Sequence, residues 1–114
     1  MKKSLLLCAT LLLTACVQIT ETGYYWGNYS ETYYQYIKSP SEATVTDHLA
    51  SLQDIIHYSA EKGLKVPPGI YAELGYIYAQ RGETQQANSM YAKEAELYPE
   101  SAKFLQGLVT KEQA

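Results

Sequence analysis

Hydrophobic residues recur at helical spacing through most of the chain. In three successive segments they fall at intervals of three and four residues, the spacing of one face of an α-helix. These positions are Leu49, Leu52, Ile55, Ile56 and Ala60, then Ile70, Tyr71, Leu74, Ile77 and Tyr78, then Ala87, Met90, Tyr91 and Ala95. No run alternates apolar and polar residues over the length of a strand. The pattern predicts an all-α fold.

Capping and helix-breaking residues predict where these three helices begin and end. Ser39-Pro40-Ser41-Glu42 has the form of a capping box with proline at the first helical position, although β-branched residues 44–46 also allow a start at Asp47. The remaining predicted boundaries are a left-handed cap at Gly63, an extended linker over 65–68, a start at Pro68, a stop at Gly82, an N-cap at Thr84 and a stop before Pro99.

Two shorter helices are expected on either side. The first extends from Glu31 to about Lys38 with Ser30 as its N-cap, and it carries Tyr29, Tyr33, Tyr36 and Ile37 along one side. Its tyrosines are expected to pack against the helix of Leu49, Leu52 and Ile56. The last extends from Ser101 to about Thr110 and presents Phe104, Leu105 and Leu108. It suits a capping helix.

Residues 68–101 resemble one tetratricopeptide repeat. The matching positions are Tyr71, Leu74, Gly75 and Tyr78 in the first helix, Ala87 and Tyr91 in the second, and Pro99 at the end. Gly75 and Ala87 leave room for the two helices to approach closely. Glu94 departs from the pattern, because a small residue is usual at its position. The resemblance implies a helical hairpin, which needs flanking helices because one repeat cannot bury its apolar faces alone.

The first fifteen residues have the layout of a secretory signal, with Lys2 and Lys3 before the apolar segment 5–13. Leu13-Thr14-Ala15-Cys16 resembles the bacterial lipobox, which implies cleavage before Cys16 and lipidation of its sulfur. Three acyl chains would anchor the protein permanently. Val17 follows the cysteine in place of the aspartate that retains such proteins in the inner membrane. We therefore expect an outer-membrane lipoprotein whose domain faces the periplasm. An ordinary signal peptide is the alternative.

This interpretation divides the chain into a signal peptide (1–15), a lipidated tether (16–23) and one helical domain (24–112). The formal charge of −3 becomes −5 once Lys2 and Lys3 are removed, and no cluster of basic residues remains. The charge excludes a nucleic-acid interface. The mature chain would have no second cysteine after Cys16, so neither a disulfide nor a cysteine metal site is expected.

Seven aromatic residues lie between Tyr24 and Tyr36. Tyr24, Tyr25 and Trp26 precede the first helix, beside the tether. Three interpretations are open for them: part of the core, a docking patch for a protein, or a contact with lipid headgroups.

The segment YYWGNYSETYYQY, followed by helices and the repeat-like pair, resembles a family of small proteobacterial outer-membrane lipoproteins with an uncharacterised domain. The genes of that family tend to neighbour a lipoprotein similar to the curli secretion channel. The resemblance implies a periplasmic adaptor in an outer-membrane lipoprotein assembly. The alternative is a structural lipoprotein that binds peptidoglycan or lipid. The candidate binding residues are Tyr24, Tyr25 and Trp26, together with Glu73, Tyr76 and Gln80, which lie with Ala72 and Ala79 on the ligand-contacting face of such a repeat.

Catalytic chemistry finds little support in the sequence. His48 and His57 are nine residues apart on one helix and cannot share a metal ion, and no activated serine or cysteine is evident beside them. We expect these histidines, like Glu94 and Glu96, to be solvated on helix surfaces. The sequence thus predicts no enzyme, no cofactor and no metal site.

Overall fold

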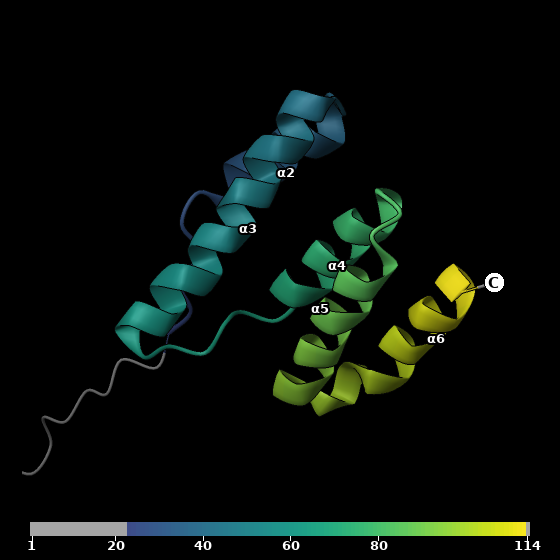
Figure 1. Cartoon of the computed structure of the whole chain (residues 1–114). Coiled ribbons are helices and arrows are strands. Elements are labelled where there is room, and N and C mark those ends of the chain that lie inside the picture. The colour runs from purple at the N-terminus through teal and green to yellow at the C-terminus, as the bar shows by residue number, and fades with distance from the viewer. Residues whose placement is uncertain (1–22, 114) are drawn as a thin grey trace, which may run out of the picture.

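The computed structural model describes residues 23–113, and every regular element in this range is a helix (Figure 1). In chain order the elements are α2 (Tyr29–Lys38), α3 (Glu42–Lys62), α4 (Ile70–Gln80), α5 (Thr84–Leu97), the 3₁₀ helix η1 (Pro99–Ser101) and α6 (Ala102–Gln113). The prediction of an all-α fold is confirmed. The predicted signal peptide, the lipidation site Cys16 and tether residues 16–22 lie outside the described residues.

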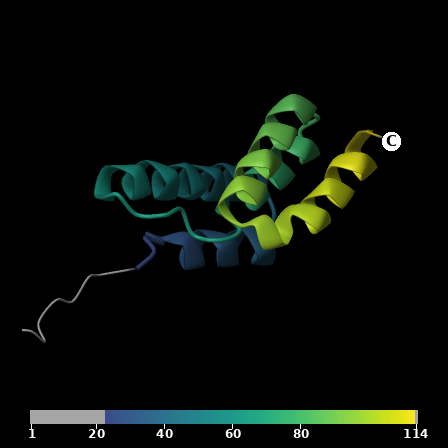
Figure 2. The ribbon, with the colours of Figure 1, turned by 90° about the horizontal axis from the view of Figure 1, so that it is seen from below.

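Each helix packs mainly on its neighbours in sequence. α2 lies against α3, α4 forms an antiparallel pair with α5, and α6 packs on α5. α3 also contacts α4, so the two pairs lie side by side with α6 at the far edge (Figures 1 and 2). α2 and α4 meet on one side of the molecule, where the Tyr29 hydroxyl bonds to Glu73.

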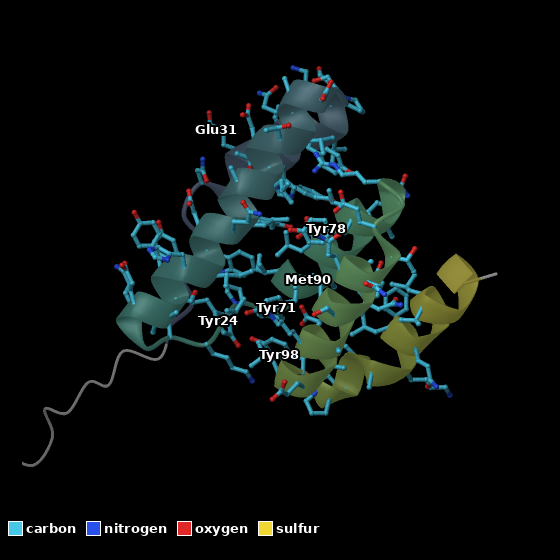
Figure 3. The ribbon with its side chains drawn as sticks, in the orientation of Figure 1. Tyr24, Glu31, Tyr71, Tyr78, Met90 and Tyr98 are labelled. Atoms are coloured by element: carbon cyan, nitrogen blue, oxygen red, sulfur yellow. The ribbon has the colours of Figure 1, made fainter. Side chains whose placement is uncertain are left out.

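The main core lies between the two pairs. Its buried members are Leu52 and Ile55 of α3, Val66 of the linker, and Ile70, Leu74 and Ile77 of α4. Tyr71, Tyr78 and Met90 lie over it from the α4–α5 side (Figure 3). A second cluster joins α5 to α6 through Ala87, Tyr91 and Leu105. The helix faces that carry the predicted apolar residues are therefore the buried ones.

Gly75 allows α4 to approach α5 closely. A β-carbon at position 75 would clash with Cε1 of the buried Tyr91 ring. The atoms nearest to such a β-carbon all belong to the Tyr91 ring, so Gly75 leaves room for this ring of α5 against α4.

Several predicted helix ends are wrong by one or two residues. α3 begins after Ser41, whose side chain accepts a hydrogen bond from the backbone N–H of Thr44 while the Thr44 hydroxyl accepts one from the Ser41 N–H. This capping box lies two residues beyond the predicted one and excludes a start at Asp47. Ser30 and Thr84 lie inside their helices, after Asn28 and Glu83, and Gly69 precedes α4 in place of Pro68. Gly63 is left-handed as predicted, with φ 65°.

Phe104, one of the three apolar residues on the last predicted helix, is 70% exposed. The neighbouring Leu105 takes the buried position on α6 instead. Ile37 and Tyr33 on α2 are also exposed, although the Tyr33 ring approaches His48 of α3.

We predict that Gly75→Ala lowers the free energy of unfolding by about 1–3 kcal/mol. The added methyl group overpacks the contact with Tyr91, which outweighs the gain in helix propensity of about 1 kcal/mol. Urea unfolding followed by circular dichroism measures the change. Gly107→Ala on α6 is the matched control, because nothing lies within 4 Å of its added methyl group. That variant should be slightly more stable than the parent, and equal effects at the two glycines would refute the packing argument.

Candidate functional site

A buried histidine joins three helices at the centre of the candidate site. His48 of α3 is 0% exposed. Its Nδ1 lies 2.9 Å from the Thr32 hydroxyl of α2, and its Nε2 lies 2.9 Å from Oε1 of Glu73 on α4. The Tyr29 hydroxyl of α2 donates to the other oxygen of Glu73. The expectation that His48 is solvated is wrong, because its polar partners come from other helices.

Two proton arrangements satisfy this network. Thr32 can donate to Nδ1 while a neutral imidazole donates from Nε2 to Glu73. Alternatively, Thr32 donates to the Tyr29 carbonyl, 3.2 Å away, and a doubly protonated ring donates to both neighbours. In either case both Glu73 oxygens have a donor. Burial, the hydrogen bond to Glu73 and the charge of that carboxylate all raise the pKa of Tyr29, so its phenol keeps its proton.

The order hydroxyl, imidazole, carboxylate is also that of a nucleophilic triad, but its surroundings do not favour acyl transfer. Thr32 is buried, and its own backbone N–H bonds to the Asn28 carbonyl, so the N–H beside its hydroxyl is not available to an oxyanion. The carboxylates of Glu31, Asp47 and Asp54 line the groove beside Thr32, and their charge would oppose a developing oxyanion. The arrangement is suited to holding helices together.

Aromatic rings surround this network and continue to the surface. Tyr29, Tyr33 and Tyr36 of α2 each approach the His48 ring, with centroid separations of 5.3, 5.7 and 5.5 Å. Trp26 contacts Tyr29 edge-on at 5.2 Å, and Tyr29 stacks on Tyr33 at 5.6 Å.

The ring of Tyr76 on α4 completes this surface. Tyr76 lies one turn after Glu73, whose carboxylate bonds to Tyr29 and His48, so it is on the side of α4 that meets α2. Burial raises the pKa of Tyr36, and the neighbouring Tyr76 and Glu73 raise it further. We call the surface formed by Trp26, Tyr33, Tyr36 and Tyr76 the aromatic face. Trp26 is 40% exposed, Tyr33 42% and Tyr76 49%. Aromatic area therefore remains uncovered above the buried hydrogen bonds of His48 with Thr32 and Glu73.

The segment before α2 folds back onto the domain. The Tyr25 ring packs against the core and lies 5.4 Å from the Tyr58 ring. The Tyr24 ring is half exposed and meets Trp26 edge-on at 6.5 Å. Tyr24 lies close to Tyr98 (Figure 3), and after the larger effect of burial it raises the pKa of Tyr98, whose hydroxyl donates to the Val66 carbonyl. The three predicted binding residues thus differ: Tyr25 is partly core, whereas Tyr24 and Trp26 are exposed.

The other predicted binding residues lie on α4. Tyr76 and Gln80 are exposed beside α2, and Glu73 has both carboxylate oxygens bonded internally. Ala72 and Ala79 turn toward α5 and α6. Sequence reasoning identified Tyr76 and Trp26 but did not connect them through His48.

Glu94 of α5 is a second buried polar residue that the sequence analysis placed wrongly on the surface. It is 2% exposed. Its carboxylate accepts hydrogen bonds from the backbone N–H groups of Gly69 and Ala72, each at 3.2 Å. These are unpaired donors at the N-terminus of α4, where the helix dipole also favours negative charge. Glu94 therefore caps α4 from the neighbouring helix. Its charge adds to burial in raising the pKa of Tyr71.

Residues 23–113 contain neither a cluster of metal ligands nor a helix that could span a membrane. In this part of the chain no three histidine, cysteine, aspartate or glutamate side chains gather closely enough to hold a metal ion. None of its helices is long and apolar enough to cross a bilayer.

We predict that Glu94→Gln lowers the free energy of unfolding by about 1–3 kcal/mol, because a charged acceptor at the α4 N-terminus becomes a neutral amide. Glu96→Gln, two residues away and exposed, removes the same charge and should change stability by less than about 0.5 kcal/mol. Urea unfolding of both variants measures the difference. A loss in Glu96→Gln as large as that in Glu94→Gln would contradict the capping role.

We predict that stability falls as the pH rises above the ordinary tyrosine pKa of about 10. Tyr29 keeps its proton in the folded state to higher pH than in the unfolded state, so unfolding releases protons and becomes more favourable. Tyr29→Phe should flatten this decline, and the exposed Tyr34→Phe should not. Thermal melting between pH 8 and roughly 11 measures the slope. The same slope in the parent and Tyr29→Phe would refute the assignment.

Comparison with known protein families gives one match, to the domain of unknown function DUF4810, over residues 24–108. No curated protein and no solved structure matches the chain. The matched segment contains the His48 network, the aromatic face and Glu94. Since it also covers well over half of the sequence, the chain belongs to the DUF4810 family.

Proposed function

We propose that the protein is a lipid-anchored adaptor of the periplasm that binds another envelope protein through its aromatic face. The observation that carries the proposal is the exposure of tryptophan and tyrosine rings on a base fixed by buried hydrogen bonds. Trp and Tyr dominate the binding energy of protein interfaces, and rigid anchors lose little entropy on binding. A face of this kind is suited to docking.

The α4–α5 pair supports the comparison with a tetratricopeptide repeat. Gly75 and Tyr91 lie in contact at the closest approach of the two helices, and α6 follows as a capping helix. Glu94 differs from the usual small residue, but its carboxylate has a defined partner in the start of α4. In such repeats the first helix of each pair contacts the ligand. Here the corresponding helices are α2 and α4, which carry the aromatic face.

The anchor and the partner rest on sequence resemblance. Cys16 in its lipobox-like context supports lipidation, and Val17 supports sorting to the outer membrane. The family resemblance supports a partner similar to the curli secretion channel. An interface of standard size needs about 800 Å² from each protein, which would occupy most of the side formed by α2 and α4.

We predict that Trp26→Ala weakens capture of a channel-forming envelope lipoprotein at least tenfold. The measure is the yield of a photocrosslink from position 80, beside the aromatic face, in intact cells. Truncating a central aromatic anchor typically costs about 2 kcal/mol or more. Phe104→Ala is the matched control, because it removes a more exposed ring from α6, away from the face. Circular dichroism of both variants should match the parent.

Equal loss of capture in Phe104→Ala would refute the aromatic face as the docking surface. Retention on purified peptidoglycan that Trp26→Ala abolishes would instead assign the face to glycan. The anchor is tested separately: labelled palmitate should enter the parent and be lost in Cys16→Ser, which should leave the membrane fraction. Membrane retention of Cys16→Ser would refute lipid anchoring.

A further inference from the structure

The rings of the aromatic face have no cation of their own. Elsewhere in residues 23–113 four lysine ammonium groups lie over tyrosine rings, at 4.2 to 5.7 Å from the ring centroids. None of those rings belongs to the aromatic face. Because the face of an aromatic ring carries a partial negative charge, it attracts cations. The aromatic face therefore has a capacity for cations that the described part of the chain leaves unused.

Glu73 adds a formal negative charge next to these rings. Its side chain is 27% exposed, and Tyr76 follows it by one turn on the same side of α4. The Tyr29 hydroxyl and the His48 ring each bond to one of its oxygens. A carboxylate has about four acceptor sites, so further donors can still bind. Within residues 23–113 no lysine or arginine forms a salt bridge with Glu73.

The rings are held in fixed orientations before any partner arrives. Tyr29 and Tyr33 stack with an interplanar angle of 9°, and Tyr36 lies nearly parallel to the His48 ring, at 10°. His48 is itself buried and hydrogen-bonded on both nitrogens. Binding a group to such a surface orders few side chains, which lowers the entropic cost.

We propose that the aromatic face binds the guanidinium group of an arginine side chain from the partner protein, stacked on the exposed rings and hydrogen-bonded to Glu73. The inference rests on the proposed function and names the chemistry of its partner. Guanidinium is planar, stacks on aromatic rings and carries N–H donors that suit a carboxylate. An ammonium group is compact and more strongly hydrated. A neutral sugar could stack on the rings but would leave the charge of Glu73 without a counter-ion.

Trp26 provides the measurement, because it is the only tryptophan in the sequence and lies on the aromatic face. The full chain is titrated at low salt with a blocked pentapeptide that has arginine at its centre and glycine elsewhere, and Trp26 fluorescence is recorded. A saturable change is expected. The same peptide with citrulline, a neutral group of nearly the same shape, should bind about tenfold more weakly. The lysine peptide should bind several-fold more weakly than the arginine peptide.

Variants separate the contributions of the rings and the carboxylate. Tyr76→Leu should weaken binding several-fold, whereas Tyr76→Phe keeps the ring and should bind like the parent. This pair leaves the hydrogen bonds of His48 untouched. Glu73→Gln should reduce arginine binding to the level of citrulline, with circular dichroism to check that the helices remain. Glu96→Gln removes a distant exposed charge and should bind like the parent.

Equal binding of the arginine and citrulline peptides would overturn this proposal. It would leave the docking function intact, since that function is tested by capture of the envelope protein in Trp26→Ala. Weakening by Glu96→Gln equal to that by Glu73→Gln would also overturn it, because the attraction would then be diffuse. A saturable response to a peptidoglycan fragment, with none to the arginine peptide, would overturn it in favour of glycan.

Discussion

Hydrogen bonding of the buried His48 imidazole determines where α2 lies relative to α4. Thr32 is the one residue of α2 in the buried class, and the apolar packing of this helix comes from partly exposed rings such as Tyr29. Thr32 and Glu73 satisfy the two ring nitrogens from opposite sides, and a buried imidazole lacking either partner would be costly. The network therefore favours one placement of α2. That placement brings Tyr33 and Tyr36 beside Tyr76 and so creates the aromatic face.

In the α4–α5 pair, Glu94 likewise holds one helix against the other through buried hydrogen bonds. Its carboxylate spans from α5 to the N-terminus of α4 and fixes the start of that helix. Gly75 allows the Tyr91 ring to lie against α4 a turn further along. A small helical domain has a limited apolar core. Here apolar burial supplies stability, and the buried polar side chains of His48 and Glu94 orient the helices relative to one another.

The sequence predicted the helices and most buried stripes because periodicity is local. It failed for His48 and Glu94 because their burial depends on partners 25 residues away in the chain. Nothing adjacent to either residue signals such a partner, and polar residues are exposed by default. The error in the start of α3 has a local cause. Both Ser39 and Ser41 could serve as the N-cap from the sequence, and in the structure Ser41 does so by pairing with Thr44 in a capping box. The predicted N-caps Ser30 and Thr84 are also wrong, because Asn28 and Glu83 take these positions without a side-chain hydrogen bond.

The composition of α2 is best explained by its two surfaces. A helix that serves only the core would bury its apolar side chains, yet Tyr33, Tyr34 and Ile37 are all exposed while its one buried side chain is a threonine. Exposed rings add nothing to folding that polar residues would not supply at lower risk of aggregation. Thr32 separates the aromatic face from the groove lined by Glu31, Asp47 and Asp54 and bonds to the histidine beneath the face. α2 is therefore an element with two exposed surfaces, held in place by its hydrogen bond to His48.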